Sequence, residues 1–205
     1  EHGGVGGELD FEERAVEGLA SALNIIEEHG VTCGDLAWER SAAWRGLVAQ
    51  LFDGPDGARE LELLRSIEIH GGADQTSSDA LLLAGWLIAR LGLAPADVTV
   101  ADSTVTATMY DGTREVRIVV APSDDRSNLS LLSVATADAS FRIERHSESG
   151  HLHVREDWDA GSMRRVVEAP PEDDASLVAI ALDGAHGASL YEQSARAAVS
   201  LFRSA

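Results

Sequence analysis

The chain has 205 residues, of which 44% are apolar, so composition favours one packed globular domain and excludes a disordered chain. The net charge is −19 and all 16 basic residues are arginine. A field this negative repels phosphate backbones and anionic lipids, which excludes general nucleic-acid and membrane-surface binding. The longest apolar run, Ala80 to Ala89, is half the length of about 20 residues that a membrane-spanning helix needs.

The first half of the chain reads mainly as helix. Glycines dominate residues 1–9, which we expect to be a flexible N-terminal segment, and residues 10–205 are expected to form a single domain. Apolar residues at spacings of three and four, bounded by Asp or Ser caps and by glycines, indicate helices. The predicted helices cover residues 10–29, 36–52 and 77–91, with a short helical stretch after residue 57 and a strand over residues 64–70.

After Pro95 the apolar period changes from 3.6 to 2, which is typical of strands. Asp111-Gly112 is a strong hairpin signal, and the chain returns to helix from Asp173. Helices, then a run of strands, then helices predict an α+β fold with a mostly antiparallel sheet of about six to seven strands. The strands are expected at residues 98–100, 105–109, 116–120, 129–134, 141–145, 151–155 and 164–168, and the last helices at 174–182 and 189–202.

An arginine lies on the apolar side of the second predicted helix. At about 100° per residue, Arg40 falls about 40° from Trp44, which marks the core face, and Trp38 lies near 120°, close to Arg45. One interpretation pairs Arg40 with a buried carboxylate and puts Trp38 at the rim of the core, since buried charges persist only when they are paired. The other is a Trp/Arg patch that contacts a protein partner, because both residue types are enriched among interface anchors.

The histidines and the single cysteine are the remaining candidates for chemistry. His151 and His153 share one face of a predicted strand and His146 precedes them, which makes these three the weak candidates for a zinc or nickel site. Solvent-facing neutral histidines explain the pattern equally well, and we expect no metal. Cys33 excludes an internal disulfide and is typical of a reducing compartment. Its neighbour His29 is accompanied by no third orienting group, so no nucleophile is predicted.

Two tryptophan-bearing segments carry a family resemblance. The first, DLAWERSAAWR, runs from Asp35 to Arg45, and the second, LLAGWLIARLG, runs from Leu82 to Gly92. With LYEQSA near the end of the chain, these runs resemble the C-terminal domain of the OpcA family, which assists glucose-6-phosphate dehydrogenase. One departure is Ala43, where family members often have proline.

The resemblance implies a bacterial, cytoplasmic and non-catalytic accessory protein. Such a protein needs no cofactor, binds glucose-6-phosphate dehydrogenase, promotes its assembly and activates it allosterically in the oxidative pentose phosphate pathway. Trp38, Arg40 and Arg45 are the predicted partner contacts. The alternative function is a small domain that binds or senses an anionic ligand, such as a sugar phosphate, through Arg40 and Arg45.

Overall fold

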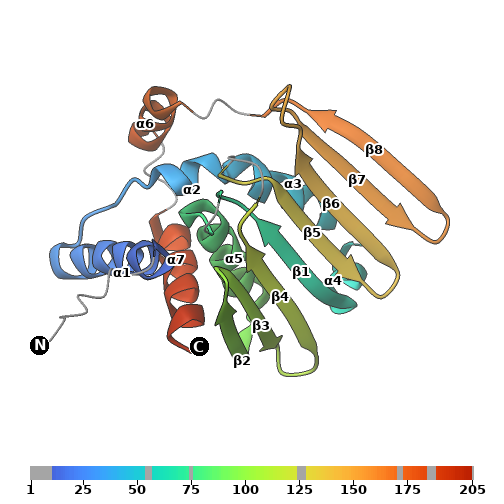
Figure 1. Ribbon diagram of the computed structural model, residues 1–205, viewed down its shortest axis with the longest axis horizontal. Coiled ribbons are helices and arrows are strands. Elements are labelled where there is room, and N and C mark those ends of the chain that lie inside the picture. The colour runs from blue at the N-terminus through green and yellow to red at the C-terminus, as the bar shows by residue number, and fades with distance from the viewer. Residues whose placement is uncertain are drawn as a thin grey trace, which may run out of the picture.

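The computed structural model describes residues 11–53, 57–73, 76–123, 128–169, 173–183 and 188–204. The N-terminal segment 1–9, predicted to be flexible, lies outside these residues. Within them one mixed sheet is covered on a single face by helices (Figure 1). This confirms the predicted α+β class.

The sheet of the described chain has eight strands in the order β2-β3-β4-β1-β5-β6-β7-β8. Every neighbouring pair is antiparallel except β1 and β4, which run parallel. The prediction of about six to seven mostly antiparallel strands is therefore close. The strands are β1 (Leu64–His70), β2 (Ala94–Ala101), β3 (Thr104–Tyr110), β4 (Glu115–Ala121), β5 (Leu131–Thr136), β6 (Ala139–Arg145), β7 (Leu152–Trp158) and β8 (Gly161–Val167).

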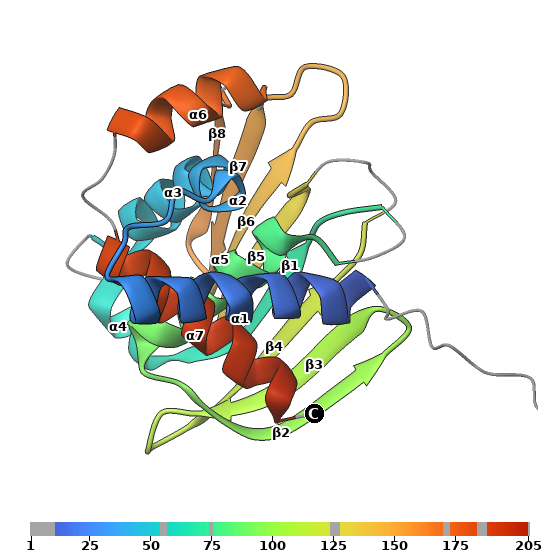
Figure 2. The ribbon, with the colours of Figure 1, turned by 90° about the vertical axis from the view of Figure 1, so that its left-hand side faces the viewer.

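The helices form layers behind the sheet. Helix α5 contacts β1 and β4, α7 packs on α5, and α1 crosses α7 on the outside (Figure 2). Helix α6 lies against α2. The helices are α1 (Phe11–His29), α2 (Leu36–Arg40), α3 (Ala42–Phe52), α4 (Gly57–Glu62), α5 (Ser78–Leu91), α6 (Asp174–Asp183) and α7 (Ala188–Arg203). None of the helices in the described ranges combines the length and the apolar character that crossing a bilayer requires.

Helix α5 is buried nearly all round, as its apolar sequence predicts. The Ser77 hydroxyl accepts a hydrogen bond from the Ala80 N–H and caps its start, and Gly92, in the left-handed region at φ 63°, ends it. Gly85 faces α7 so closely that a Cβ would overlap the carbonyl oxygen of Ser194 and approach the backbone nitrogen of Ala198 to 2.9 Å. The glycine thus permits the close approach of the two helices.

The sheet has one buried and one open face. Strand alternation turns residues such as Ile67, Ile69 and Ile118 toward α5, where each is at most 1% exposed. The opposite face carries the intervening residues, among them Ser66 and Glu68, and no helix of the described chain covers it (Figure 1). We call this the outer face.

The predicted helix over residues 36–52 is wrong as a single element. The structure divides it at Ser41 into α2 and α3. The Trp38 carbonyl accepts hydrogen bonds from the Ser41 hydroxyl at 2.8 Å and from Arg45 Nη1 at 2.6 Å. These side-chain donors satisfy the carbonyl at the end of α2, which allows the chain to turn there.

Candidate functional site

Asp35 joins the start of α2 to the C-terminal helix. One carboxylate oxygen caps α2 by accepting hydrogen bonds from the N–H groups of Ala37 at 2.8 Å and Trp38 at 3.2 Å. The other accepts a hydrogen bond from the Tyr191 hydroxyl of α7 at 3.0 Å. Burial, followed by the charge of Asp35, raises the pKa of Tyr191, so the phenol stays a donor. A single carboxylate therefore fixes α2 against α7.

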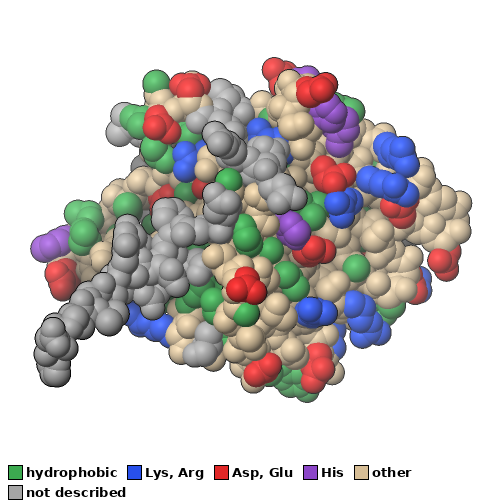
Figure 3. Space-filling model, viewed as in Figure 1, with side chains coloured by type: hydrophobic (Ala, Val, Ile, Leu, Met, Phe, Trp, Pro, Cys, Tyr) green, Lys and Arg blue, Asp and Glu red, His purple; other side chains and the backbone are tan. Residues whose placement is uncertain are grey.

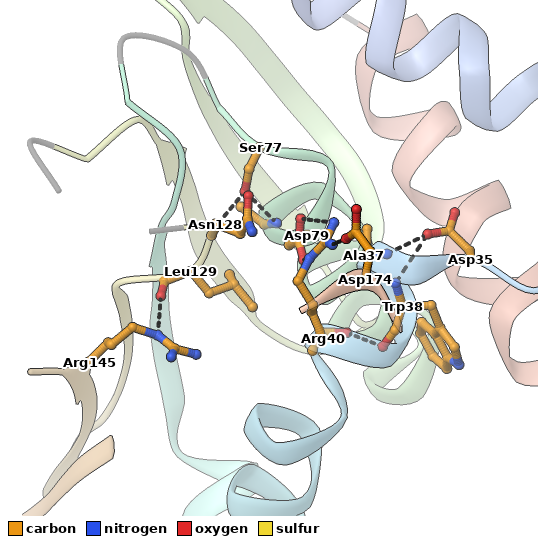
Figure 4. A network of polar contacts seen from close by, with 12 residues as sticks. Asp35, Ala37, Trp38, Arg40, Ser77, Asp79, Asn128, Leu129, Arg145 and Asp174 are labelled. Carbon is orange, nitrogen blue, oxygen red and sulfur yellow. Dashed lines mark hydrogen bonds and ion pairs between the residues drawn. The ribbon is translucent and has the colours of Figure 1, made fainter. Parts of the chain in front are cut away.

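Arg40 makes a buried ion pair with Asp79 in the first turn of α5 (Figure 4). Arg40 Nε lies 2.8 Å from Asp79 Oδ1, and Nη2 lies 3.5 Å from Oδ2. The side chain of Asp79 is 3% exposed and that of Arg40 is 17% exposed. Burial raises the pKa of Asp79, and the hydrogen bond and charge of Arg40 oppose that rise. The interpretation that Arg40 pairs with a buried carboxylate is confirmed.

Trp38 and Arg45 lie face to face. The Arg45 guanidinium carbon is 3.4 Å from the centre of the Trp38 ring, which is cation–π geometry. The Trp38 ring also packs edge-on against Tyr191, with centroids 5.9 Å apart, and the residue is 7% exposed. Burial lowers the pKa of Arg45 to about 10. The structure brings Trp38 and Arg45 into contact and engages Arg40 separately with Asp79. Contact of these three residues with a partner stays a prediction.

A hollow of about 680 Å³ opens beside this cluster, between α1, α2 and α5. Arg40 lines it, but Asp35 and Asp79 line it too, and the Asp174 carboxylate lies 3.7 Å from Arg40 Nη1. Two carboxylates beside the guanidinium and a third in the lining of the hollow offset its positive charge, which disfavours a phosphate. The geometry does not favour the anion site considered from the sequence.

Only two of the three candidate histidines lie together. The rings of His146 and His153 stack with centroids 5.0 Å apart and border a second hollow of about 620 Å³, whereas His151 does not line it. Among the residues that the structure describes, no three His, Cys, Asp or Glu side chains are grouped to hold a metal ion. Cys33 is largely exposed. Its partial burial, followed by the charge of the nearby Asp35, raises the pKa of the thiol, which disfavours the nucleophilic thiolate.

The outer face carries a feature that the sequence reasoning missed. Arg142 of β6 is the register partner of Arg155 of β7, and Arg155 is the register partner of Arg164 of β8. Three arginines thus form one row across three adjacent strands, which we call the arginine row. Basic side chains gather over this end of the sheet in Figure 3. The sequence places an arginine at an outward position of each of these three strands. That the three arginines are neighbours follows only once the register of the strands is known.

The residues quoted for the family resemblance hold the helical layer together. Asp35, Trp38 and Arg40 anchor α2, while Gly85 sets the spacing of α5 and α7. The family model that describes the C-terminal domain of a glucose-6-phosphate dehydrogenase subunit matches residues 31–195, which include all of these. The chain belongs to the OpcA family. Among curated proteins, the putative OxPP cycle protein OpcA of Nostoc punctiforme is 36% identical over 76 residues, which are 36% of this chain and 16% of that relative.

Solved structures of low sequence identity share the fold of this OpcA-family chain. A variant of KijD10, a 3-ketoreductase from Actinomadura kijaniata, superposes with a TM-score of 0.60 at 14% identity, over 90% of this chain and 66% of that one. GnnA, a UDP-N-acetylglucosamine 3-dehydrogenase from Acidithiobacillus ferrooxidans, gives a TM-score of 0.52 at 14% identity, over 91% and 65%. At such identity the similarity concerns architecture alone.

Proposed function

We propose that this domain is a non-catalytic accessory protein that binds glucose-6-phosphate dehydrogenase, promotes its assembly and raises its activity allosterically. The observation that carries the proposal is the family match over residues 31–195. The curated relative is matched over only 16% of its length, so the role of the whole protein is part of the proposal. The dehydrogenase and this domain would meet in the bacterial cytoplasm, as part of the oxidative pentose phosphate pathway.

The use of the motif residues supports an interaction role. Arg40 is neutralised by Asp79, and Trp38 packs against Arg45 and Tyr191. These side chains therefore stabilise the fold of the domain. The alternative, a sensor of anionic ligands, is supported less well because the carboxylates of Asp35 and Asp79 line the hollow beside Arg40. A domain of this kind acts through the surface that it presents.

The decisive experiment measures dehydrogenase activity with and without the purified domain. We expect the initial rate to rise with domain concentration and to saturate, and sedimentation to show a complex of the two proteins. Addition of the heat-unfolded domain is the control. An unchanged rate together with separate sedimentation of the two proteins at micromolar concentrations would overturn the proposal.

The predicted patch on α2 and α3 is tested in the same assay. We propose that it acts through Arg45, whose guanidinium covers the Trp38 ring. An Arg45→Met variant keeps an unbranched side chain over the ring and removes the charge. Lower activation at unchanged melting temperature supports a contact at Arg45, whereas unchanged activation places the partner surface elsewhere.

A further inference from the structure

The two edges of the sheet are built differently. Among the described residues, β2 ends the sheet on one side and β8 ends it on the other (Figure 1). Strand β2 contains Pro95, and its register with β3 shifts between Pro95 and Asp97, two devices that protect an edge from further pairing. Strand β8 contains no proline and pairs with β7 without a register shift over Gly161–Val167. The β8 edge is regular, and no other strand of the described residues pairs with it.

The hairpin geometry shows which backbone groups of β8 face outward. Trp158 and Gly161 flank a two-residue turn. In a hairpin with such a turn the two flanking residues are hydrogen-bonded to each other. Pairs alternate along an antiparallel ladder, so Gly161, Met163, Arg165 and Val167 bond to β7. The N–H and C=O groups of the three residues between them point away from the sheet. These residues are Ser162, Arg164 and Val166.

The side chains at this edge are basic and apolar. Arg164, at the end of the arginine row, is exposed, as are Val166 at 60% and Met163 at 44%. The two inner arginines of the row pair with Glu144 and Asp157, each at 2.6 Å. In the described part of the chain Arg164 makes no ion pair. The edge therefore presents a positive charge on a protein of net charge −19.

We propose that β8 receives an extended acidic segment of the dehydrogenase as a ninth strand. This inference rests on the function proposed above and assigns it a contact surface in addition to the patch at Arg45. Strand addition uses the outward N–H and C=O groups, while acidic side chains of the added strand would face Arg164. A second copy of this chain fits less well. Antiparallel pairing of all seven residues would put Arg164 directly opposite its own counterpart, and like charges in that position are destabilising.

Two variants of β8 and two matched controls test the proposal with the whole domain and the purified dehydrogenase. Val166→Pro removes an outward N–H without touching the ladder to β7, and Arg164→Glu reverses the charge. As the control for Val166→Pro, Val100→Pro removes an outward N–H of β2, next to the two-residue turn between Ala101 and Thr104. Arg117→Glu reverses an exposed charge of β4 on the outer face.

We expect each β8 variant to weaken dehydrogenase binding about tenfold or more, with both controls within about twofold and all melting temperatures preserved. The loss for Arg164→Glu should shrink as salt is added. In the complex, amide exchange at Arg164 and Val166 should slow. If Val166→Pro fails to fold, Arg164→Glu and the exchange data decide.

Wild-type binding with unaffected β8 variants would overturn this inference and leave the proposed function standing. A change in the domain's own sedimentation with the β8 variants, at unchanged dehydrogenase affinity, would overturn it in favour of a second copy. Absence of binding by the wild-type domain would overturn both.

Discussion

The ion pair between α2 and α5 gives the sharpest prediction on stability. In Arg40→Met, a side chain of similar length loses its charge, and the Asp79 carboxylate, 3% exposed, is left without its partner at 2.8 Å. Removing one partner of a buried pair costs about 3–5 kcal/mol, a fifth or more of the roughly 5–15 kcal/mol that stabilises a typical domain. The free energy of unfolding at pH 7, from urea titration, measures this loss.

The loss should depend on pH in a defined direction. Burial raises the pKa of Asp79 above its ordinary 3.8, and Arg40 opposes that rise, so the pKa in Arg40→Met is higher still. A carboxyl whose folded pKa is raised adds stability below its unfolded pKa, and this contribution disappears as pH rises through the folded pKa. The deficit of the variant relative to wild type should therefore be largest near neutral pH and shrink toward pH 4.

Two controls separate a buried pair from a surface one. Asp174 lies 3.7 Å from the same guanidinium but is 79% exposed, so Asp174→Asn should cost less than about 1 kcal/mol. The double variant Arg40→Met/Asp79→Leu removes both charges and should recover most of the stability lost in Arg40→Met. A cost for Arg40→Met below about 1 kcal/mol, or no recovery in the double variant, would refute the reasoning.

The remaining predictions concern packing and a turn. Gly85→Ala should destabilise by about 1–3 kcal/mol in urea titration because its Cβ meets the main chain of α7, whereas Gly46→Ala, with open space around its Cβ, should not destabilise. Trp86→Ala, at an 8% exposed core position, should cost about 3–5 kcal/mol, and an unchanged melting temperature would contradict this. Hydrogen bonds from Thr113 lower the pKa of Asp111 to about 2, so its stabilisation should be complete above its unfolded pKa of 3.8 and lost as pH falls through 2. The melting temperature of Asp111→Ala should then be lower than that of the wild type at pH 7, and the two melting temperatures should become equal as the pH falls through about 2.

Local patterns in the sequence predicted the elements well where one face of each is buried. The alternation around Ile67 and Ile69 placed the strand over residues 64–70 where the structure has it, and the Asp111-Gly112 signal lies at the turn between β3 and β4. The helical core face was also predicted, since Trp44 is fully buried. Strand order and the parallel pairing of β1 with β4 were not accessible, because these depend on contacts between segments far apart in the chain.

The sequence predicted which residues belong to the candidate site, but it did not identify the side chains with which they interact. Helical angles placed Arg40 on the core side, which required a carboxylate, but nothing local identified Asp79, 39 residues later, as that carboxylate. The break at Ser41 was missed because it depends on side-chain donors to a single carbonyl. The arginine row appears only when the registers of three strands are combined.

Helix α7 has a consequence for the order in which the protein folds during synthesis. This helix supplies the hydroxyl that donates to Asp35 and the surface that Gly85 approaches, although Asp35 and Gly85 precede it by 156 and about 110 residues. While the ribosome is still adding residues, the strands can pair with neighbours in sequence, but α2 and α5 lack their C-terminal partner. Completion of the helical layer must follow the emergence of α7 from the ribosome, and until then the apolar surface of α5 is a target for chaperones.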